Sequence, residues 1–96
     1  MFEIRQTTRY RVWFEALRDR QAKARVVARV RRLQEGNPGP HRQLAGGVLE
    51  LTIDFGPGYR LYCSPRADAY VVLLVGGDKS SQSDDIAAAQ AMAKEI

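Results

Sequence analysis

Residues 48–75 constrain the fold most strongly, because apolar and polar side chains alternate along them and two turn sequences interrupt the alternation. Residues 48–55 read VLELTIDF, a period of two that is typical of a strand with one buried face. The GPG that follows at 56–58 lacks a backbone donor at Pro57 and permits positive φ at its two glycines. The segment therefore predicts two consecutive hairpins, with strands near residues 48–55, 59–64 and 70–75.

A three-residue turn at 56–58 also predicts the register of the first hairpin. The expected neighbours are Ile53 with Leu61 and Leu51 with Cys63 on the buried face, and Asp54 with Arg60, Thr52 with Tyr62 and Glu50 with Ser64 on the other. The second face would then carry a guanidinium, a phenol and two carboxylates close together. We take this polar face as the candidate functional site, with Asp54 expected to pair with Arg60.

The size and composition of the chain predict one soluble domain over residues 1–96. The chain has 96 residues, of which 45% are hydrophobic, and its apolar runs fall short of the roughly 18 residues of a membrane span. Its amino-terminal residues lack the pattern of a secretory signal, so we expect a cytoplasmic location. With one Cys and one His, the sequence predicts no metal site and suggests no cofactor. Cys63 is expected to be a buried, unreactive thiol.

The amino-terminal third is basic and has helical periodicity. Between Arg5 and Arg32 there are ten Lys or Arg against two acidic residues, which suggests either a polyanionic partner or an ordinary solvated helix face. After a short edge strand at Phe2–Gln6, a first helix capped by Thr7 or Thr8 carries an aromatic stripe at residues 10, 13, 14 and 17. This stripe would form either core or, less simply, a platform for stacking bases.

A second helix is predicted over Gln21–Gln34, ending at the Gly- and Pro-rich residues 36–40. Its apolar face is expected to contain Val26, Val27, Val30 and Leu33. On its opposite side Arg25, Arg29 and Arg32 recur at i, i+4 and i+7, which predicts a single cationic stripe. The two helices would form a hairpin across one face of the sheet. Residues 36–47 are predicted to be a loop, and its His41 either lies exposed or has a role in proton transfer.

The carboxy-terminal residues predict a closing helix. Gly76 and Gly77 would allow a sharp turn after the last strand, and Ser81 or Ser83 would cap a helix with Asp84 and Asp85 in its first turn. The inward face of this helix is expected to contain Ile86, Ala89, Ala93 and Ile96. The predicted fold class is therefore α+β: a small antiparallel twisted sheet of about four strands, an amino-terminal helical hairpin on one face, and a carboxy-terminal helix.

Two motifs make the chain resemble a known family. GxxELxIxFGPGYRLY at residues 47–62 and LLxGGDKSSQxxDI at residues 73–86 are similar to the RelE/ParE superfamily of toxins, more narrowly its HigB-like "addiction module killer" branch. The resemblance implies a RelE-like fold and a ribosome-dependent endoribonuclease that cleaves mRNA. It also implies a cognate antitoxin, which in this branch is usually a helix-turn-helix DNA-binding protein.

The resemblance also assigns site residues. Arg60 and Lys79 would contact the scissile phosphate, and Arg42 stands where relatives have Lys. Relatives have Arg at the position of Thr52, so this chain has one charge fewer on the site face. Two alternatives follow: a ParE-like inhibitor of DNA gyrase, or a module that has lost catalysis and only binds nucleic acid.

The residues themselves suggest how such cleavage would work. Attack by the RNA 2′-hydroxyl requires in-line geometry, charge stabilisation, a proton acceptor and a donor to the leaving oxygen. Glu50 is either the base or a surface carboxylate, and Tyr62 either stacks on a base, donates a proton or simply packs. Gln82 and Asp78 would orient a nucleotide or, as we favour, cap backbone. Because cations outnumber bases, we expect catalysis by orientation and electrostatics, with Arg25, Arg29 and Arg32 docking on ribosomal RNA.

Overall fold

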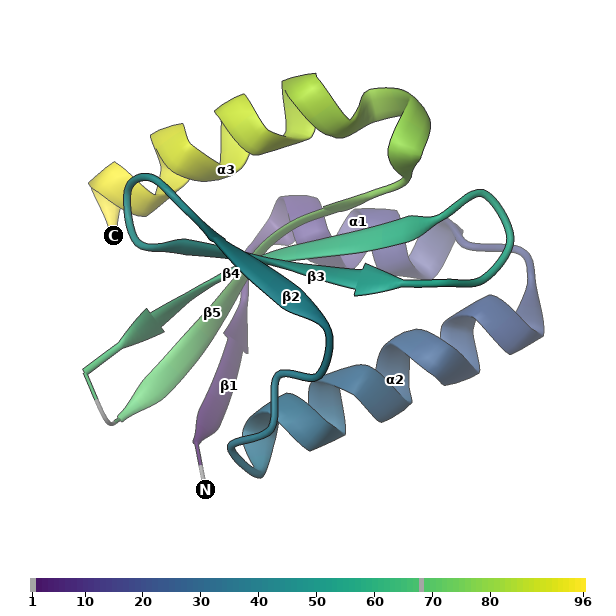
Figure 1. Ribbon diagram of the computed structural model, residues 1–96, viewed down its shortest axis with the longest axis horizontal. Coiled ribbons are helices and arrows are strands. Elements are labelled where there is room, and N and C mark those ends of the chain that lie inside the picture. The colour runs from purple at the N-terminus through teal and green to yellow at the C-terminus, as the bar shows by residue number, and fades with distance from the viewer. Residues whose placement is uncertain (1, 68) are drawn as a thin grey trace.

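The computed structural model describes residues 2–67 and 69–96 and contains one five-stranded sheet in the order β1-β5-β4-β3-β2 (Figure 1). Its strands are β1 (Glu3–Gln6), β2 (His41–Leu44), β3 (Val48–Ile53), β4 (Tyr59–Arg66) and β5 (Tyr70–Gly77). Its helices are α1 (Thr8–Ala16), α2 (Arg20–Gln34), the 3₁₀ turn η1 (Lys79–Ser81) and α3 (Gln82–Glu95). The α+β prediction is confirmed, with one strand more than expected.

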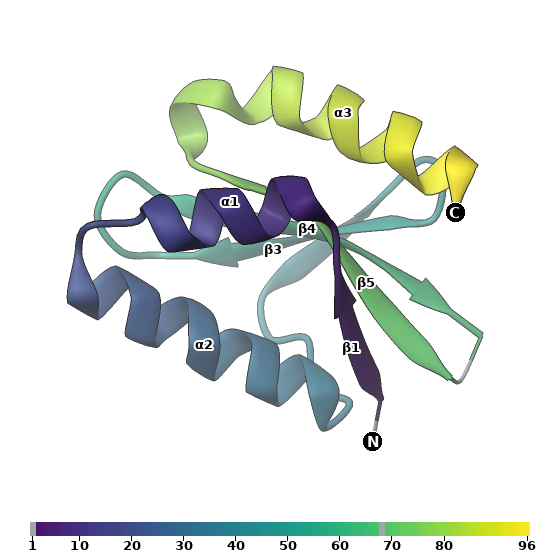
Figure 2. The ribbon, with the colours of Figure 1, turned by 180° about the vertical axis from the view of Figure 1, so that it is seen from behind.

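The sheet lies between two helical layers. Figures 1 and 2 show α1 and α2 on one face and α3 on the other. Tyr10, Val26 and Leu33 pack with Leu51, Leu61 and Leu73 in one core, whereas Ala89 and Ala93 pack with Tyr62 and Leu74 in a second. The side chains of β3 and β4 that point away from the helical hairpin are therefore covered by α3.

Local sequence explains where the two amino-terminal helices begin and end. The Thr7 hydroxyl accepts a hydrogen bond of 3.0 Å from the backbone N–H of Tyr10, and Asp19 accepts one of 2.8 Å from Gln21 at the start of α2. At the end of α2, Gly36 has φ +94°, the left-handed conformation that glycine permits. The aromatic stripe is core, as one alternative predicted, because Tyr10 is buried and Trp13, Phe14 and Leu17 pack against the same cluster.

The predicted register of the first hairpin is wrong by two residues. Thr52 pairs with Arg60, Leu51 with Leu61 and Glu50 with Tyr62, because the strands are joined through residues 54–58 rather than through three residues. A shift of two preserves the face of every side chain. The predicted separation of apolar and polar faces therefore holds, but Asp54 does not oppose Arg60.

Several local predictions need correction. The loop predicted at residues 36–47 contains β2, which pairs with β3, and β1 joins β5 in parallel. Val27 is 46% exposed and Ile96 is 51% exposed, so neither side chain belongs to the hydrophobic core, contrary to the prediction.

Gly76 and Gly77 do not form a turn but lie buried inside β5. A Cβ on Gly76 would overlap the indole of Trp13, and one on Gly77 would overlap the carboxylate of Asp85. These glycines therefore allow α1 and α3 to approach the strand closely.

Candidate functional site

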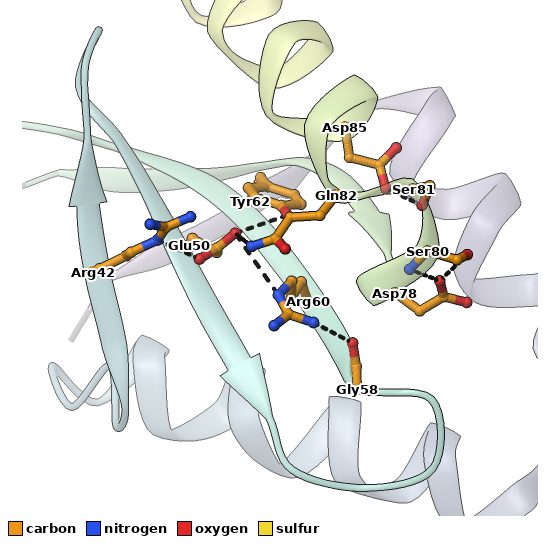
Figure 3. A network of polar contacts seen from close by, with 10 residues as sticks. All are labelled: Arg42, Glu50, Gly58, Arg60, Tyr62, Asp78, Ser80, Ser81, Gln82 and Asp85. Atoms are coloured by element: carbon orange, nitrogen blue, oxygen red, sulfur yellow. Dashed lines mark hydrogen bonds and ion pairs between the residues drawn. The ribbon is translucent and has the colours of Figure 1, made fainter.

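Glu50 lies at the centre of the candidate site, in the middle of β3. Its register neighbours are Arg42 on β2 and Tyr62 on β4, and its side chain faces the first turn of α3 (Figure 3). Only 2% of Glu50 is exposed, because β2 and α3 cover it. The sequence predicted a solvent-facing carboxylate at this position, and that prediction is wrong.

Three donors satisfy the buried carboxylate of Glu50. Arg42 Nε lies 2.6 Å from Oε1, and the Tyr62 hydroxyl and Gln82 Nε2 donate to Oε2 at 2.9 and 3.0 Å. These donors come from β2, β4 and α3, so one carboxylate connects three elements (Figure 3). Gln82 therefore binds a side chain rather than capping backbone, while Asp78 accepts a bond of 2.8 Å from Ser80 N–H, as the capping alternative predicted.

These contacts set the charge state of the network. Burial by itself raises the pKa of Glu50, but the hydrogen bonds from Arg42, Gln82 and Tyr62 outweigh it and hold that pKa below its usual value. Burial and the bond to Glu50 raise the pKa of the Tyr62 phenol. Glu50 is thus a weakly basic carboxylate with its oxygens occupied, which argues against a role as general base.

Tyr62 is fully buried, so its ring is not available to stack on an RNA base. Of the three sequence alternatives for this residue, simple packing agrees with its position in the core beneath α3. Its hydroxyl has a fixed partner in Glu50.

Arg60 lies at the edge of this network with donors to spare. Its side chain is 16% exposed, its Nη1 donates to the carbonyl of Gly58 at 2.7 Å, and its Nε is 3.9 Å from Oε2 of Glu50. That Nε is buried and has no hydrogen-bond partner within residues 2–67 and 69–96. The expected pair with Asp54 is replaced by this longer approach to Glu50.

Lys79 lies on the same rim as Arg60. It is the first residue of η1, separated by one residue from the end of β5 at Gly77, and it is exposed. The point that a Cβ on Gly58 would occupy is 3.2 Å from Arg60 Nη1 and 3.7 Å from Lys79 Cβ. The Arg60 guanidinium and the Cβ of Lys79 therefore both lie beside Gly58.

The cationic stripe predicted on α2 is interrupted, because Arg29 is 93% buried while Arg25 and Arg32 are exposed. Arg29 Nε and Nη2 donate to the Pro38 carbonyl at 3.1 and 3.0 Å, and its guanidinium also donates to the carbonyls of Pro40 and Thr52. Arg29 thus connects α2 to the following loop and to β3. Such a role depends on where loop carbonyls lie, which helical spacing does not reveal.

Sequence reasoning missed a second buried carboxylate. Asp85 is 6% exposed, accepts a hydrogen bond of 2.5 Å from the Ser81 hydroxyl, and lies 3.5 Å from Arg9 Nη2 of α1. The sequence predicts Asp85 only as an acidic residue in the first turn of the last helix. The glycine pair beneath it, where a Cβ on Gly77 would collide with the carboxylate, was the available signal.

The remaining candidates have simpler positions. His41 is exposed on β2, with Nδ1 2.7 Å from the Gly39 carbonyl oxygen. Cys63 faces the core as predicted, and burial raises the pKa of its thiol to about 12.

Among the described residues, no group of three His, Cys, Asp or Glu side chains is placed to hold a metal ion. Within the same residues, no helix has the length and apolar character needed to cross a membrane.

Comparison with known proteins gives a relative along nearly the whole chain. An uncharacterized protein of Haemophilus influenzae (strain ATCC 51907 / DSM 11121 / KW20 / Rd) is 42% identical over 94 residues, which are 98% of this chain and 95% of that protein. The two proteins belong to one family. No family model matches the chain. Membership in the family of the Haemophilus protein therefore fixes a common ancestry and fold, while the activity has to be argued from the site.

Proposed function

We propose that this protein is the toxin of a type II toxin–antitoxin system, an endoribonuclease that cleaves mRNA on the ribosome and stops translation. The observation that carries the proposal is the rim around Gly58, where the partly exposed guanidinium of Arg60 and the exposed residue Lys79 bring two positive charges together. The element order and the motifs at residues 47–62 and 73–86 support the RelE/ParE resemblance on which the substrate is based.

The chemistry proceeds by attack within the RNA itself. A bond forms between the 2′-oxygen and phosphorus while the bond from phosphorus to the 5′-oxygen breaks, leaving a 2′,3′-cyclic phosphate and a 5′-hydroxyl. The 2′-hydroxyl proton passes to water, and water protonates the leaving oxygen. Arg60 and Lys79 stabilise the negative charge that develops on the phosphoryl oxygens.

Glu50 contributes to this chemistry by holding Arg60 in place. Its carboxylate is occupied by Arg42, Tyr62 and Gln82 and lies 3.9 Å from Arg60 Nε. This attraction draws Nε toward the sheet, and Nη1 donates to the Gly58 carbonyl, so Nη2 would remain for phosphate. No protein base is assigned, and in-line geometry would depend on the ribosome, so cleavage without the ribosome should be slow.

Partners follow from the same proposal. A free translation inhibitor would arrest its own host, so a cognate antitoxin, of helix-turn-helix type by resemblance, would cover the cationic rim. Both proteins and the ribosome would meet in the cytoplasm.

The decisive experiment is induced expression followed by mapping of mRNA 5′ ends. Arg60→Ala and Lys79→Ala should each reduce ribosome-bound cleavage about 10²- to 10³-fold, the typical effect of losing one preorganised donor. Lys94→Ala, which removes an exposed lysine from the other end of α3, should cleave like the unaltered protein. Wild-type cleavage by both site variants contradicts the proposal.

The two alternatives give different results in this experiment. Growth arrest without new mRNA 5′ ends, together with loss of supercoiling by purified gyrase, identifies a gyrase inhibitor. A harmless chain that still binds RNA identifies a module without catalysis, for which Thr52 and the hydrogen-bonded Glu50 would be the structural reasons.

A further inference from the structure

A pocket of about 350 Å³ lies against α2. Residues from α2, the following loop and the end of β3 line it, among them Arg25, Arg29, Arg32, Pro40, Thr52 and Asp54. The three arginines that the sequence placed along one stripe therefore surround one cavity.

Arg29 forms a fixed positive wall of this pocket. Its guanidinium is held by the carbonyls of Pro38, Pro40 and Thr52, all of which are neutral acceptors. The charge of Arg29 is therefore immobilised without being neutralised. Burial, followed by the charge of Arg32, lowers the pKa of Arg29, which shows that the two cations repel each other. An anion between them would relieve that repulsion.

Arg25 and Arg32 supply the exposed charges. Both are exposed, and neither has a carboxylate oxygen within 4.0 Å in the part of the chain that the structure describes. The Arg25 guanidinium lies over the Phe55 ring, 4.3 Å from its centroid, which orients it without neutralising it. The acidic lining residue is Asp54, so positive charge exceeds negative charge around the cavity.

We propose that this pocket binds a phosphate group of RNA, with Arg25 and Arg32 as donors and Arg29 as a fixed positive wall. A volume of about 350 Å³ is within the range of small-molecule sites, roughly 300–1,000 Å³, and admits a nucleotide rather than a bare phosphate alone. The proposal rests on the proposed function only in naming RNA as the source of the phosphate.

The pocket meets the Arg60 rim at Thr52. Thr52 lines the pocket and is the register neighbour of Arg60 across β3 and β4. An RNA strand that binds in the pocket would therefore continue toward Arg60.

The test measures RNA binding in the full chain with Arg60→Ala, which prevents cleavage during the assay. The probe is a fluorescein-labelled 12-nucleotide single-stranded RNA, followed by anisotropy at several salt concentrations. Arg25→Gln with Arg32→Gln should weaken binding at least about 10-fold and reduce the salt slope by about 0.7, the value for one phosphate contact.

Charge-matched controls separate a pocket from a generally basic helix. Arg20→Gln with Arg31→Gln removes two exposed arginines of α2 that do not line the cavity, and should change affinity less than about two-fold. Asp54→Asn should strengthen binding. Equal weakening by both double variants, or an unchanged affinity with Asp54→Asn, overturns the pocket.

The outcomes also separate this inference from the proposed function. If the unaltered protein does not cleave mRNA but the pocket variants weaken RNA binding selectively, the nuclease proposal fails and the pocket stands. If the unaltered protein cleaves and both double variants weaken binding alike, the pocket alone fails.

Discussion

Glu50 and Tyr62 oppose each other across β3 and β4, and the Tyr62 hydroxyl donates a hydrogen bond of 2.9 Å to the buried Glu50 carboxylate. Both residues are almost completely enclosed. A buried carboxylate is tolerated only when hydrogen bonds replace its lost hydration. The pair is therefore a structural contact that stabilises the fold next to Arg60.

Removing the Tyr62 hydroxyl should leave the buried Glu50 carboxylate with one hydrogen bond fewer. Tyr62→Phe is expected to lower the free energy of unfolding by about 1–3 kcal/mol, the cost of an unsatisfied buried group. Urea denaturation at pH 7 measures this loss. Tyr59→Phe removes a hydroxyl from the same strand that does not contact Glu50, and serves as the control. Equal stability of the two variants would show that the hydrogen bond contributes nothing.

The low pKa of Glu50 predicts how stability depends on pH. Because its pKa in the folded protein lies below the ordinary 4.5, its stabilising contribution is complete above pH 4.5. As the pH falls further, the unfolded chain takes up a proton first and this contribution is lost. Glu50→Gln should be less stable at pH 7 and should lose less stability between pH 5 and pH 3, as measured by urea denaturation. Identical pH profiles would contradict the prediction.

The glycine pair in β5 predicts strong intolerance of a methyl group. Gly76→Ala would press on the Trp13 ring and Gly77→Ala on the Asp85 carboxylate, so each should cost about 3 kcal/mol or more. Gly47→Ala is the control, since Gly47 has φ +74° but nothing within 4 Å of a new Cβ, and should cost about 1 kcal/mol. Thermal unfolding compares the three variants, and a ranking with Gly47→Ala as the most damaging would refute close packing as the reason.

Arg29 provides a test of the connection between α2 and β3. Arg29→Lys keeps the charge but loses the planar fork that reaches the carbonyls of Pro38, Pro40 and Thr52. A loss of about 2–3 kcal/mol in the free energy of unfolding is expected. Arg31→Lys alters an exposed neighbour and should stay within about 0.5 kcal/mol. Calorimetry of both variants decides whether the guanidinium geometry matters.

The sequence predicted the sheet well where its pattern was strong. The alternation at residues 48–55 located β3, and the aromatic spacing at residues 10–17 located the inner face of α1. It failed at β2, because HRQL is short, polar and follows a Gly- and Pro-rich segment. The predicted register of β3 and β4 was wrong because the turn extends over residues 54–58, and the GPG sequence does not indicate at which residue strand pairing ends.

The sequence predicted which strand residues of the candidate site share a face, but not how deeply they are buried. Strand alternation predicted that Glu50, Arg60 and Tyr62 share one face, as observed. Arg42 reaches Glu50 from β2 and Gln82 reaches it from α3, and alternation predicted neither contact. The burial of Glu50 and Tyr62 depends on α3 packing over that face, and Arg29 is buried by a loop that bends back onto α2. Both effects are tertiary, and neither leaves a periodic signal along the chain.

The parallel pairing of β1 with β5 has a consequence for biosynthesis. Glu3 aligns with Tyr70 and Gln6 with Leu73, so the first strand to leave the ribosome has to wait for the last strand. Contacts so distant along the chain form late and slowly. The emerging polypeptide can therefore complete its sheet only after about three quarters of it has been translated, a built-in delay between making this protein and having it folded.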